Sequence, residues 1–407
     1  MTDTQNEVFK TPVNKIRLFE HGAPGSQNLK LTRKYYTEDM PDGRVKHIVQ
    51  NITDPDIVPY IPDGIGNSTD RQRIPAVLII PGGAFRRLVY NFEGEDVAKW
   101  LNSMGIAAFV LECRLPSDEH DNAEDVPLID AMRAMRVIRG RAQEFGIDEA
   151  KIGVMGFSAG GFMAALLSTA YESDVYADYK YKDEYDKLSA RPDFAVCSYP
   201  VISIDDCIEA GKRYMSEEQV LERISDSKAK ILHKYNPDKL VRPDMPPVFI
   251  CETDDDRTTL SENSVGFYMA ARKAGVSAEL HIFRTGGHGY GCGDDLHRLV
   301  SGKYFLQSGL RVLELLVKMD MVYEDKDKII LNKPAGQLSQ SGKSFEMDLV
   351  SEVLTYRKSK GEEAYAAIIN RLDRPVSGLV LMAKNKKDSA RLSLLMQKET
   401  LCKLSQN

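Results

Sequence analysis

Short apolar runs alternate with amphipathic segments along the first three quarters of the chain. Unbroken apolar runs, which are typical of strands buried on both faces, predict strands at residues 76–80, 106–111, 152–155, 194–202, 247–251 and 278–283. Apolar residues at helical spacing predict helices at residues 93–104, 126–145, 159–170 and 262–274. Because strands and helices alternate, the crossovers should be right-handed and the strands should form a mostly parallel sheet with helices on both faces. The pattern therefore predicts an α/β fold.

The segment from Lys151 to Leu167 carries the most specific chemical signal. It places Gly156-Phe-Ser158-Ala-Gly160 between a predicted strand and a predicted helix. A serine on such a sharp turn has a strained backbone, so the residues two before and two after it must be small. Its hydroxyl then stands above the helix N-terminus, where the helix dipole and free N–H groups favour a developing anion. A Gly- and Ser-rich turn without chemistry is the alternative, but the flanking elements favour Ser158 as a nucleophile.

A second candidate feature follows the apolar run at residues 76–80. The loop Pro81-Gly-Gly-Ala-Phe85 has a glycine pair at the end of a predicted central strand, which lets backbone N–H groups approach a ligand closely. In a serine hydrolase, one oxyanion-hole donor comes from such a loop and the other from the residue after the serine. With Ser158 present, we interpret Gly83, Ala84 and Ala159 as the oxyanion hole. An ordinary β-turn is the alternative.

An acid and a histidine follow the serine, and the order Ser, acid, His is that of the α/β-hydrolases. His288 lies in a glycine-rich loop after the last predicted strand, from which an imidazole can reach the serine. Three consecutive aspartates, at 254–256, end an earlier strand. Asp256 is the best placed of them and Asp255 is the runner-up. His281 lies on a strand and is interpreted as structural.

Several remaining segments have weaker patterns. In residues 1–75, which contain strands and turns, the runs 45–52 and 57–61 are typical of edge strands. Residues 171–191 are expected to form a surface excursion near the mouth of the site, and helical segments within 203–245 fit a small cap. The arginines of the 126–145 helix are expected to form a solvated face; they are Arg133, Arg136, Arg139 and Arg141.

Residues from about 12 to 315 resemble the acetylxylan-esterase-like branch of the α/β-hydrolases. The matching stretches are Leu18–Gly25, Ile80–Gly83, Glu93–Gly105, Gly153–Gly161, Leu188–Phe194, Asp255–Thr258 with Glu262–Ser264, and Gly286–Gly289. Two residues depart from the family pattern and bear on the shape of the pocket: Ala84 and Leu260 stand where glycine and proline are usual.

The resemblance implies an α/β-hydrolase domain at residues 1–317, with Ser158, Asp256 and His288 as its catalytic triad. It further implies a serine carboxylesterase that removes short acyl groups, acetyl above all, from xylan-type carbohydrates or small esters. No cofactor and no metal are expected. A peptidase or a lipase of the same fold is the rival within this class.

Composition narrows the class of protein further. Of the 407 residues, 43% are hydrophobic and 28% are charged, as in soluble globular proteins. The six cysteines include no C-x-x-C pair, which favours reduced thiols and gives no zinc motif. The N-terminus shows no secretory signal, and no apolar run reaches the roughly 18 residues of a membrane span. We therefore expect a cytoplasmic protein with no membrane partner.

Residues 318–407 differ in charge and pattern. They carry 16 basic and 12 acidic residues, whereas residues 1–317 carry 38 basic and 48 acidic residues. Apolar alternation at 329–332 predicts a strand, and residues 370–384 read as a polar loop followed by a strand. These stretches resemble the pseudouridine synthases that modify ribosomal and transfer RNA, in which an Arg-Leu-Asp motif carries the catalytic aspartate. The resemblance implies that Asp373 is this aspartate and that Arg371 is its ionic partner.

The tail resemblance covers about 85 residues, roughly half of such a catalytic domain. We therefore expect 318–407 to be an incomplete, catalytically silent segment, because half a β-rich core leaves open edges and little buried area. Its positive charge should give weak, salt-sensitive RNA contact. An RNA-modifying or RNA-binding protein, in which the hydrolase half is a passenger, is the alternative function.

Overall fold

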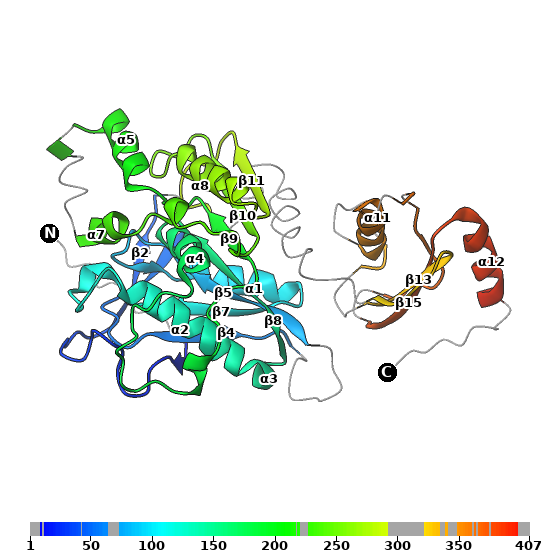
Figure 1. Cartoon of the computed structure of the whole chain (residues 1–407), viewed down its shortest axis with the longest axis horizontal. Helices are drawn as coiled ribbons and strands as arrows, with labels where there is room; N and C mark the ends of the chain where they lie inside the picture. The colour runs from blue at the N-terminus through cyan, green and yellow to red at the C-terminus, as the bar shows by residue number, and fades with distance from the viewer. Residues whose placement is uncertain are drawn as a thin grey trace. The chain divides into compact units, whose positions relative to one another are not determined.

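The computed structural model describes residues 9, 12–41, 43–63, 73–216, 218–219, 227–291, 321–333, 338–340, 348–359, 362–363, 365–373 and 376–397. The chain divides into two compact units (Figure 1). The first comprises Met1–Asn102 and Ile106–Gly302, and the second consists mainly of Lys303–Asn407. The predicted boundary between residues 317 and 318 lies outside the described residues.

The first unit is built on an eight-stranded sheet of order β1-β4-β7-β5-β8-β9-β10-β11. These strands are β1 (Ile16–Arg17), β4 (Asp56–Tyr60), β5 (Ile74–Ile80), β7 (Ala107–Glu112), β8 (Ile147–Phe157), β9 (Ala195–Ser198), β10 (Val248–Thr253) and β11 (Ala278–Phe283). The strands from β7 to β11 run parallel, whereas β1 and β4 are antiparallel additions. Every residue of β7, β9 and β10 is buried, which explains why their sequences are continuous apolar runs without alternation.

Helices cover both faces of this sheet. They are α1 (Asp96–Ser103), which follows the π-helical turn η1 (Asn91–Glu95), α2 (Val126–Gly140), α3 (Ala142–Phe145), α4 (Ala159–Ala170) and α8 (Ser261–Lys273). Helix α1 connects β5 to β7, which is a step across the sheet toward β1. Helices α2, α4 and α8 connect strands in the opposite direction across the sheet. Right-handed crossovers therefore place α1 on one face and the other three on the opposite face. In Figure 1, α2 and α4 lie in front of the strands. The predicted single helix at 126–145 is divided at Arg141.

A small antiparallel sheet of order β2-β3-β6 corrects one expectation from the sequence. It comprises β2 (Lys34–Asp39), β3 (Val45–Gln50) and β6 (Leu88–Val89). The run at 45–52 was expected to be an edge strand, yet β3 is the central strand here. The run at 57–61 corresponds to β4, which lies inside the large sheet between β1 and β7. The small sheet matters for function because β6 directly follows the loop that contains Gly83 and Ala84.

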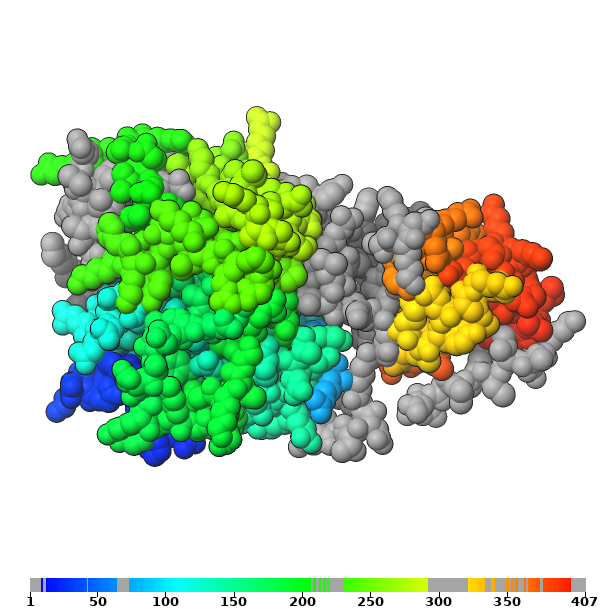
Figure 2. Space-filling view, viewed as in Figure 1, coloured from blue at the N-terminus to red at the C-terminus, as the bar shows by residue number. Residues whose placement is uncertain are grey.

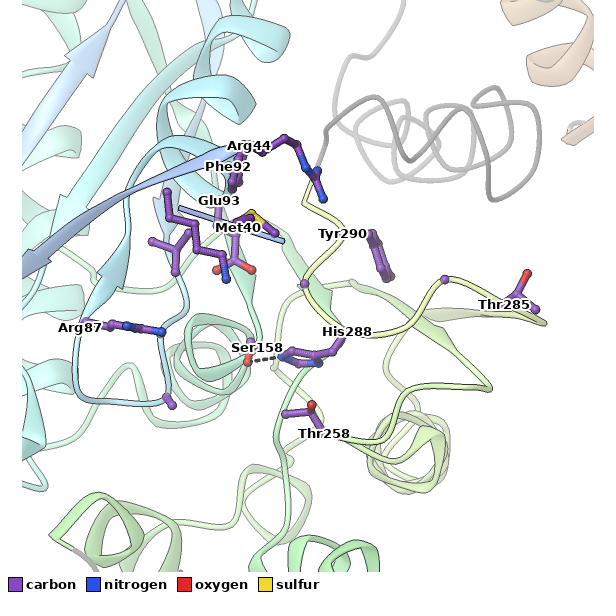
Figure 3. Close-up of a pocket in the computed structure, with 16 residues that line it drawn as sticks. Met40, Arg44, Arg87, Phe92, Glu93, Ser158, Thr258, Thr285, His288 and Tyr290 are labelled. Atoms are coloured by element: carbon purple, nitrogen blue, oxygen red, sulfur yellow. Dashed lines mark hydrogen bonds between the residues drawn. The ribbon is translucent and has the colours of Figure 1, made fainter. Parts of the chain in front are cut away.

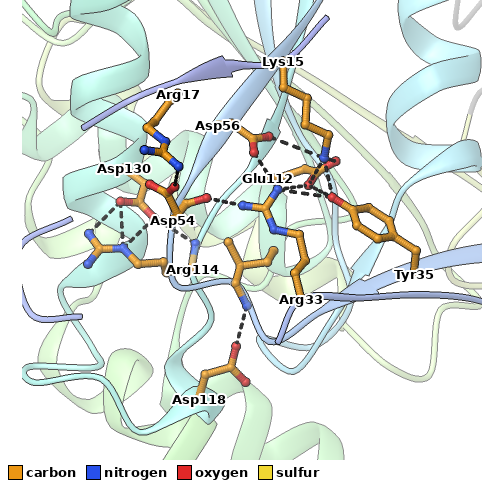
Figure 4. Close-up of polar contacts among 11 residues, drawn as sticks. Lys15, Arg17, Arg33, Tyr35, Asp54, Asp56, Glu112, Arg114, Asp118 and Asp130 are labelled. Carbon is orange, nitrogen blue, oxygen red and sulfur yellow. Dashed lines mark hydrogen bonds and ion pairs between the residues drawn. The ribbon is translucent and has the colours of Figure 1, made fainter. Parts of the chain in front are cut away.

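A buried ionic cluster connects the N-terminal segment to the large sheet (Figure 4). Glu112, at the end of β7, is completely buried and accepts hydrogen bonds from Lys15 Nζ at 2.6 Å, Arg33 Nη1 at 2.7 Å and the Tyr35 hydroxyl at 2.8 Å. Arg33 also contacts Asp56 Oδ2 at 2.5 Å. Each buried charge therefore has an opposite charge beside it, and removing one partner would leave an uncompensated charge.

The excursion at residues 171–191 and the arginines of α2 differ from expectation. Arg133 is only 4% exposed, and its guanidinium contacts Asp186 at 3.0 Å and the Leu18 carbonyl at 2.9 Å. Arg136 donates to the Leu188 carbonyl at 3.0 Å, and Arg139 pairs with Asp193 at 3.1 Å. The arginines donate hydrogen bonds to carbonyl and carboxylate oxygens of the excursion and the residues just after it. This segment pairs little with neighbouring strands, so its backbone carbonyls need other donors. The excursion therefore packs against α2.

The other short elements of the first unit lie mainly in the second half of its sequence. They are η2 (Pro116–Asp118), η3 (Glu184–Lys187), α5 (Ile204–Tyr214), α7 (Ser227–Lys234) and η4 (Pro237–Lys239). On the face shown in Figure 2, residues from α2 to β11 (turquoise through green to yellow-green) form much of the surface of this unit. Among the described residues, no helix combines the length and the hydropathy needed to cross a bilayer.

The second unit contains an antiparallel sheet of order β12-β13-β15-β14. Its elements are β12 (Met321–Glu324), β13 (Lys328–Lys333), α11 (Leu349–Ser359), β14 (Ala367–Ile368), β15 (Gly378–Ala383) and α12 (Lys386–Gln397). Apolar residues of β13, β15 and α11 form a core of their own: Ile329, Leu331, Leu349, Val353, Val380 and Met382. The strands predicted in this region are therefore present, and they pack against a helix.

Candidate active site

Ser158 lies on a strained turn between β8 and α4. Its backbone has φ 53° and ψ −117°, a conformation that is costly for a residue with a side chain. A Cβ at Gly156 would lie 1.9 Å from the Gly160 carbonyl oxygen, and a Cβ at Gly160 would lie 2.0 Å from the Ile80 carbonyl oxygen. Only glycine fits at these two positions, which is the physical basis of the G-x-S-x-G spacing.

The structure brings Ser158, His288 and Asp256 into one hydrogen-bonded chain. Ser158 Oγ lies 2.8 Å from His288 Nε2 (Figure 3), and His288 Nδ1 lies 2.6 Å from Asp256 Oδ2. The three residues follow the carboxyl ends of the parallel strands β8, β11 and β10, which meet at the same edge of the sheet. This geometry holds the imidazole in the tautomer that presents an acceptor nitrogen to the serine hydroxyl.

Asp256 and Asp255 make different contacts. The Asp256 carboxylate accepts hydrogen bonds from the backbone N–H of Thr258 at 2.7 Å and of Thr259 at 3.0 Å, and from Thr259 Oγ1 at 2.9 Å. Burial alone would raise the pKa of Asp256, but the hydrogen bond and charge of His288, together with these donors, hold it below its usual range. Asp255 is exposed and accepts from the Gly287 N–H at 2.8 Å. Of these two aspartates, Asp256 therefore contacts the imidazole and Asp255 does not.

The loop expected to form the oxyanion hole lies beside the serine. Gly83 and Ala84 line the same pocket as Ser158, and Ala159 begins α4 directly after it. Gly83 and Ala84 have φ values of 140° and 56°. Within the described part of the chain, neither residue's backbone N–H donates a hydrogen bond. These donors are therefore available to a ligand, and the first N–H groups of α4 also lack intrahelical acceptors.

Two buried residues, Glu93 and Tyr199, lie behind the site, and neither was predicted from the sequence. Glu93 Oε2 accepts from the Gly82 N–H at 2.8 Å, and Oε1 accepts from the Tyr199 hydroxyl at 2.9 Å. The Gly291 N–H donates to the same hydroxyl at 3.0 Å. Burial raises the pKa of Glu93, opposed by the Tyr199 hydrogen bond and by His288. The only sequence signal was a glutamate at the start of a predicted helix, which is usually exposed.

The pocket around Ser158 has a volume of about 550 Å³. Its apolar lining comes from Met40, Val89, Phe92 and Tyr290, and its cationic lining comes from Arg44, Lys46 and Arg87. Thr258, Thr285 and the glycines beside His288 complete one wall. None of the described lining residues belongs to 171–191 or to 203–245. The excursion therefore does not border the pocket, and the described part of the expected cap does not cover it.

The tail candidates lie in the second unit. Asp373 and Arg371 are both exposed, and within the described residues no ion pair joins them, contrary to the expected partnership. Among the described residues, Lys333 at the end of β13 is a buried cation on which the charge of Asp373 acts. Burial lowers the pKa of Lys333, and the charge of Asp373 opposes this effect. From the sequence, Lys333 was predicted only as part of a turn.

Comparison with known proteins identifies relatives of the first unit. The profile of the BD-FAE family matches residues 65–270. An acetylxylan esterase of Xylanibacter ruminicola is 31% identical over 220 residues, which are 54% of this chain and 41% of that protein. The chain thus spans about two fifths of the length of that curated relative. The crystal structure of an acetyl ester-xyloside bifunctional hydrolase from Caldicellulosiruptor lactoaceticus is 32% identical, covers 74% of this chain and 94% of its own, and has a TM-score of 0.51. These likenesses confirm the predicted α/β-hydrolase fold.

The second unit resembles a different family. The profile of RNA pseudouridylate synthases matches residues 327–404. A ribosomal large subunit pseudouridine synthase D of Buchnera aphidicola is 36% identical over 84 residues, which are 20% of this chain and 27% of that protein. Both resemblances expected from the sequence are therefore confirmed.

Proposed function

Because this chain belongs to the BD-FAE family, we propose that it is a serine carboxylesterase. The observation that carries the proposal is the hydrogen-bonded chain from Ser158 Oγ through His288 to Asp256, at the base of an open pocket. A serine hydroxyl is a weak nucleophile unless a base beside it accepts its proton. His288 Nε2, at 2.8 Å, is in position to do so.

The proposed reaction follows from this arrangement. Ser158 Oγ attacks the ester carbonyl carbon while His288 takes its proton, and Asp256 stabilises the imidazolium that forms. The N–H groups of Ala159 and of the Gly83–Ala84 loop receive the oxyanion. His288 then returns the proton to the leaving alcohol, which leaves an acyl group on Ser158. Water activated by His288 hydrolyses this acyl-enzyme by the same steps in reverse.

We further propose that the substrate is a short acyl ester, acetyl above all, of a xylan-type carbohydrate. Two relatives with at least 31% identity are an acetylxylan esterase and an acetyl ester-xyloside bifunctional hydrolase. The pocket volume of about 550 Å³ is within the range that holds a small ligand, far larger than an acetyl group. The remaining space, lined by Met40, Phe92 and Tyr290, suits the apolar faces of a sugar.

Hydrolysis of p-nitrophenyl acetate, butyrate and octanoate by the intact chain and by Ser158→Ala tests this function. The proposal predicts turnover that falls with acyl length and that disappears in the variant. Acetylated xylo-oligosaccharides are the next substrates. A preference for octanoate would favour a lipase, cleavage of peptides in place of esters would favour a peptidase, and ester turnover retained by Ser158→Ala would contradict the mechanism.

A second candidate function concerns the second unit, for which we propose RNA contact. The match of residues 327–404 to RNA pseudouridylate synthases and the excess of 16 basic over 12 acidic residues in 318–407 support this proposal. Tritium release from uridine-labelled RNA and RNA retention on a filter, each compared with Asp373→Ala, separate catalysis from binding. Tritium release that is lost in Asp373→Ala indicates a synthase, and RNA retention without tritium release indicates RNA contact alone. The absence of both tritium release and RNA retention contradicts the proposal.

A further inference from the structure

The positive charge of the esterase pocket is not used by the proposed ester hydrolysis. Arg44, Lys46 and Arg87 all line the pocket that contains Ser158. Arg44 directly precedes β3, Lys46 lies within β3 and Arg87 lies in the loop before β6, so all three come from the small sheet and its loops. In Figure 3, Arg87 points toward Ser158 from the side opposite His288, and Arg44 extends toward the side where Tyr290 lies. Residues 1–317 carry an excess of acidic residues, so this local positive charge differs in sign from the unit as a whole.

Two carboxylates of the described residues, Glu38 and Glu93, oppose these cations, and both accept hydrogen bonds. Glu38 contacts Arg87 at 2.5 Å, and it lies opposite Lys46 in the register of β2 and β3. This carboxylate holds Arg87 in place and balances one positive charge. Glu93 also lines the pocket, but its two oxygens accept hydrogen bonds from the Gly82 N–H and the Tyr199 hydroxyl. Among the described residues that line the pocket, three cations therefore accompany one carboxylate, that of Glu93.

Lys46 is the most informative of the three cations. Lys46 is only partly exposed, and among the described residues its ammonium group makes no hydrogen bond or ion pair, although its charge acts on the Glu93 carboxylate. A partly buried ammonium group without a hydrogen-bond partner loses hydration that a nearby charge replaces only in part. Such a group is suited to an anionic ligand, which would supply the missing partner with a charge-assisted hydrogen bond.

We propose that Arg44, Lys46 and Arg87 form a subsite for a carboxylate carried by the ester substrate. This inference rests on the proposed esterase function and deepens it. The carboxylate can belong to the acyl group, as in the half-ester of a dicarboxylic acid, or to the sugar, as in a uronic acid next to the acetylated unit. Both sources present the same chemistry to the subsite. The pocket has room for either beside an acetyl-sized group at Ser158.

Paired neutral and anionic esters test the subsite with the full chain. The acyl arm compares 1-naphthyl hydrogen succinate with 1-naphthyl butyrate, after subtraction of the spontaneous rate. The sugar arm compares acetylated xylo-oligosaccharides with and without a glucuronic acid branch. The measured quantity is the ratio of kcat/KM for the anionic substrate to kcat/KM for its neutral counterpart, in the intact protein and in Lys46→Met and Arg44→Gln.

Arg86→Gln is the matched control, because Arg86 is exposed on the same loop as Arg87 and does not line the pocket. The subsite predicts that the ratio exceeds one in at least one arm, falls about tenfold in Lys46→Met or Arg44→Gln, and is unchanged in Arg86→Gln. The arm that responds identifies the source of the carboxylate. A preference carried by the subsite should also weaken as ionic strength rises.

Two results would overturn the inference. The first is Ser158-dependent hydrolysis of the neutral esters with a ratio of one or less in both arms. The second is a ratio that changes equally in Lys46→Met, Arg44→Gln and Arg86→Gln. Either result removes the subsite and leaves the esterase function standing. Absence of Ser158-dependent hydrolysis on every ester would instead refute the proposed function, and the subsite with it.

Discussion

The Tyr199 hydroxyl donates a 2.9 Å hydrogen bond to Glu93 Oε1, and neither residue is more than 5% exposed. The other carboxylate oxygen of Glu93 accepts from the Gly82 N–H, while the Gly291 N–H donates to the Tyr199 hydroxyl. The edge of the Tyr199 ring also packs against His288, with ring centroids 5.0 Å apart. One buried pair thus connects the loop that contains Gly83 to the loop that carries His288.

Replacing Tyr199 by Phe should loosen both loops. The substitution leaves one oxygen of Glu93 and the Gly291 N–H without a partner, so the free energy of unfolding should fall by about 1–3 kcal/mol. Because the pair positions His288, kcat for p-nitrophenyl acetate should fall while KM changes little. Urea unfolding and steady-state kinetics measure the two effects. Tyr181→Phe, at a residue 42% exposed, is the control. Equal stability and kcat in the two variants would show that the pair has no positioning role.

Asp256→Asn and Asp255→Asn should differ widely in activity. An asparagine at 256 no longer accepts the Nδ1 proton of His288 as a carboxylate does, so kcat should fall by roughly 10³–10⁴. Asp255 contacts only the loop N–H of Gly287 among the described residues, and its replacement should cost less than about tenfold. The kcat for p-nitrophenyl acetate measures both changes. A larger loss in Asp255→Asn than in Asp256→Asn would assign the acid to Asp255.

Glu252 should give the stability of the protein a distinct pH dependence. Burial, followed by the charge of Asp256, raises the pKa of Glu252 to about 9. Between its ordinary pKa of about 4.5 and about 9, the folded state holds a proton that the unfolded state has lost. The free energy of unfolding should therefore decrease as pH rises through this window, by up to about 1.4 kcal/mol per pH unit from this group. Glutamine resembles the protonated carboxyl and cannot ionise.

The difference between the intact protein and Glu252→Gln isolates this effect. Urea unfolding at pH 6 and at pH 8 should show a smaller loss of stability with pH in the variant, and the variant should be the more stable of the two at pH 8. Identical slopes would mean that Glu252 is ionised in the folded protein.

Features with local causes were predictable from the sequence. The buried parallel strands are continuous apolar runs, and the turn around Ser158 requires glycines at fixed spacing, so both leave a signal within about ten residues. The order of Ser158, the aspartates and His288 along the chain also indicated the topology, because this order is that of the α/β-hydrolases. The sequence does not decide whether Asp255 or Asp256 contacts His288. The two aspartates are adjacent, and the choice depends on the direction in which each side chain leaves the loop.

Features that depend on contacts distant in sequence were not predictable. Tyr199 and Glu93 are 106 residues apart, and their contact depends on how the loop after β9 meets the turn before α1. The arginines of α2 looked like a solvated face because helical spacing alone shows polarity, not what packs there. Arg133 is buried because a segment 50 residues later supplies its carboxylate partner, Asp183. Lys333 gave no signal for the same reason, since its interaction with Asp373 joins separate parts of the second unit.

Covalent labelling with paraoxon tests the central claim, that Ser158 is the nucleophile, most directly. The organophosphate should transfer one diethylphosphoryl group to Ser158, and the resulting ester should resist hydrolysis. Peptide mass spectrometry should then place the label on Ser158, and hydrolysis of p-nitrophenyl acetate should decline in proportion to labelling, with no label at this position in Ser158→Ala. Full hydrolysis by a protein labelled completely at Ser158, or inactivation accompanied by labelling of a different residue, would contradict the account.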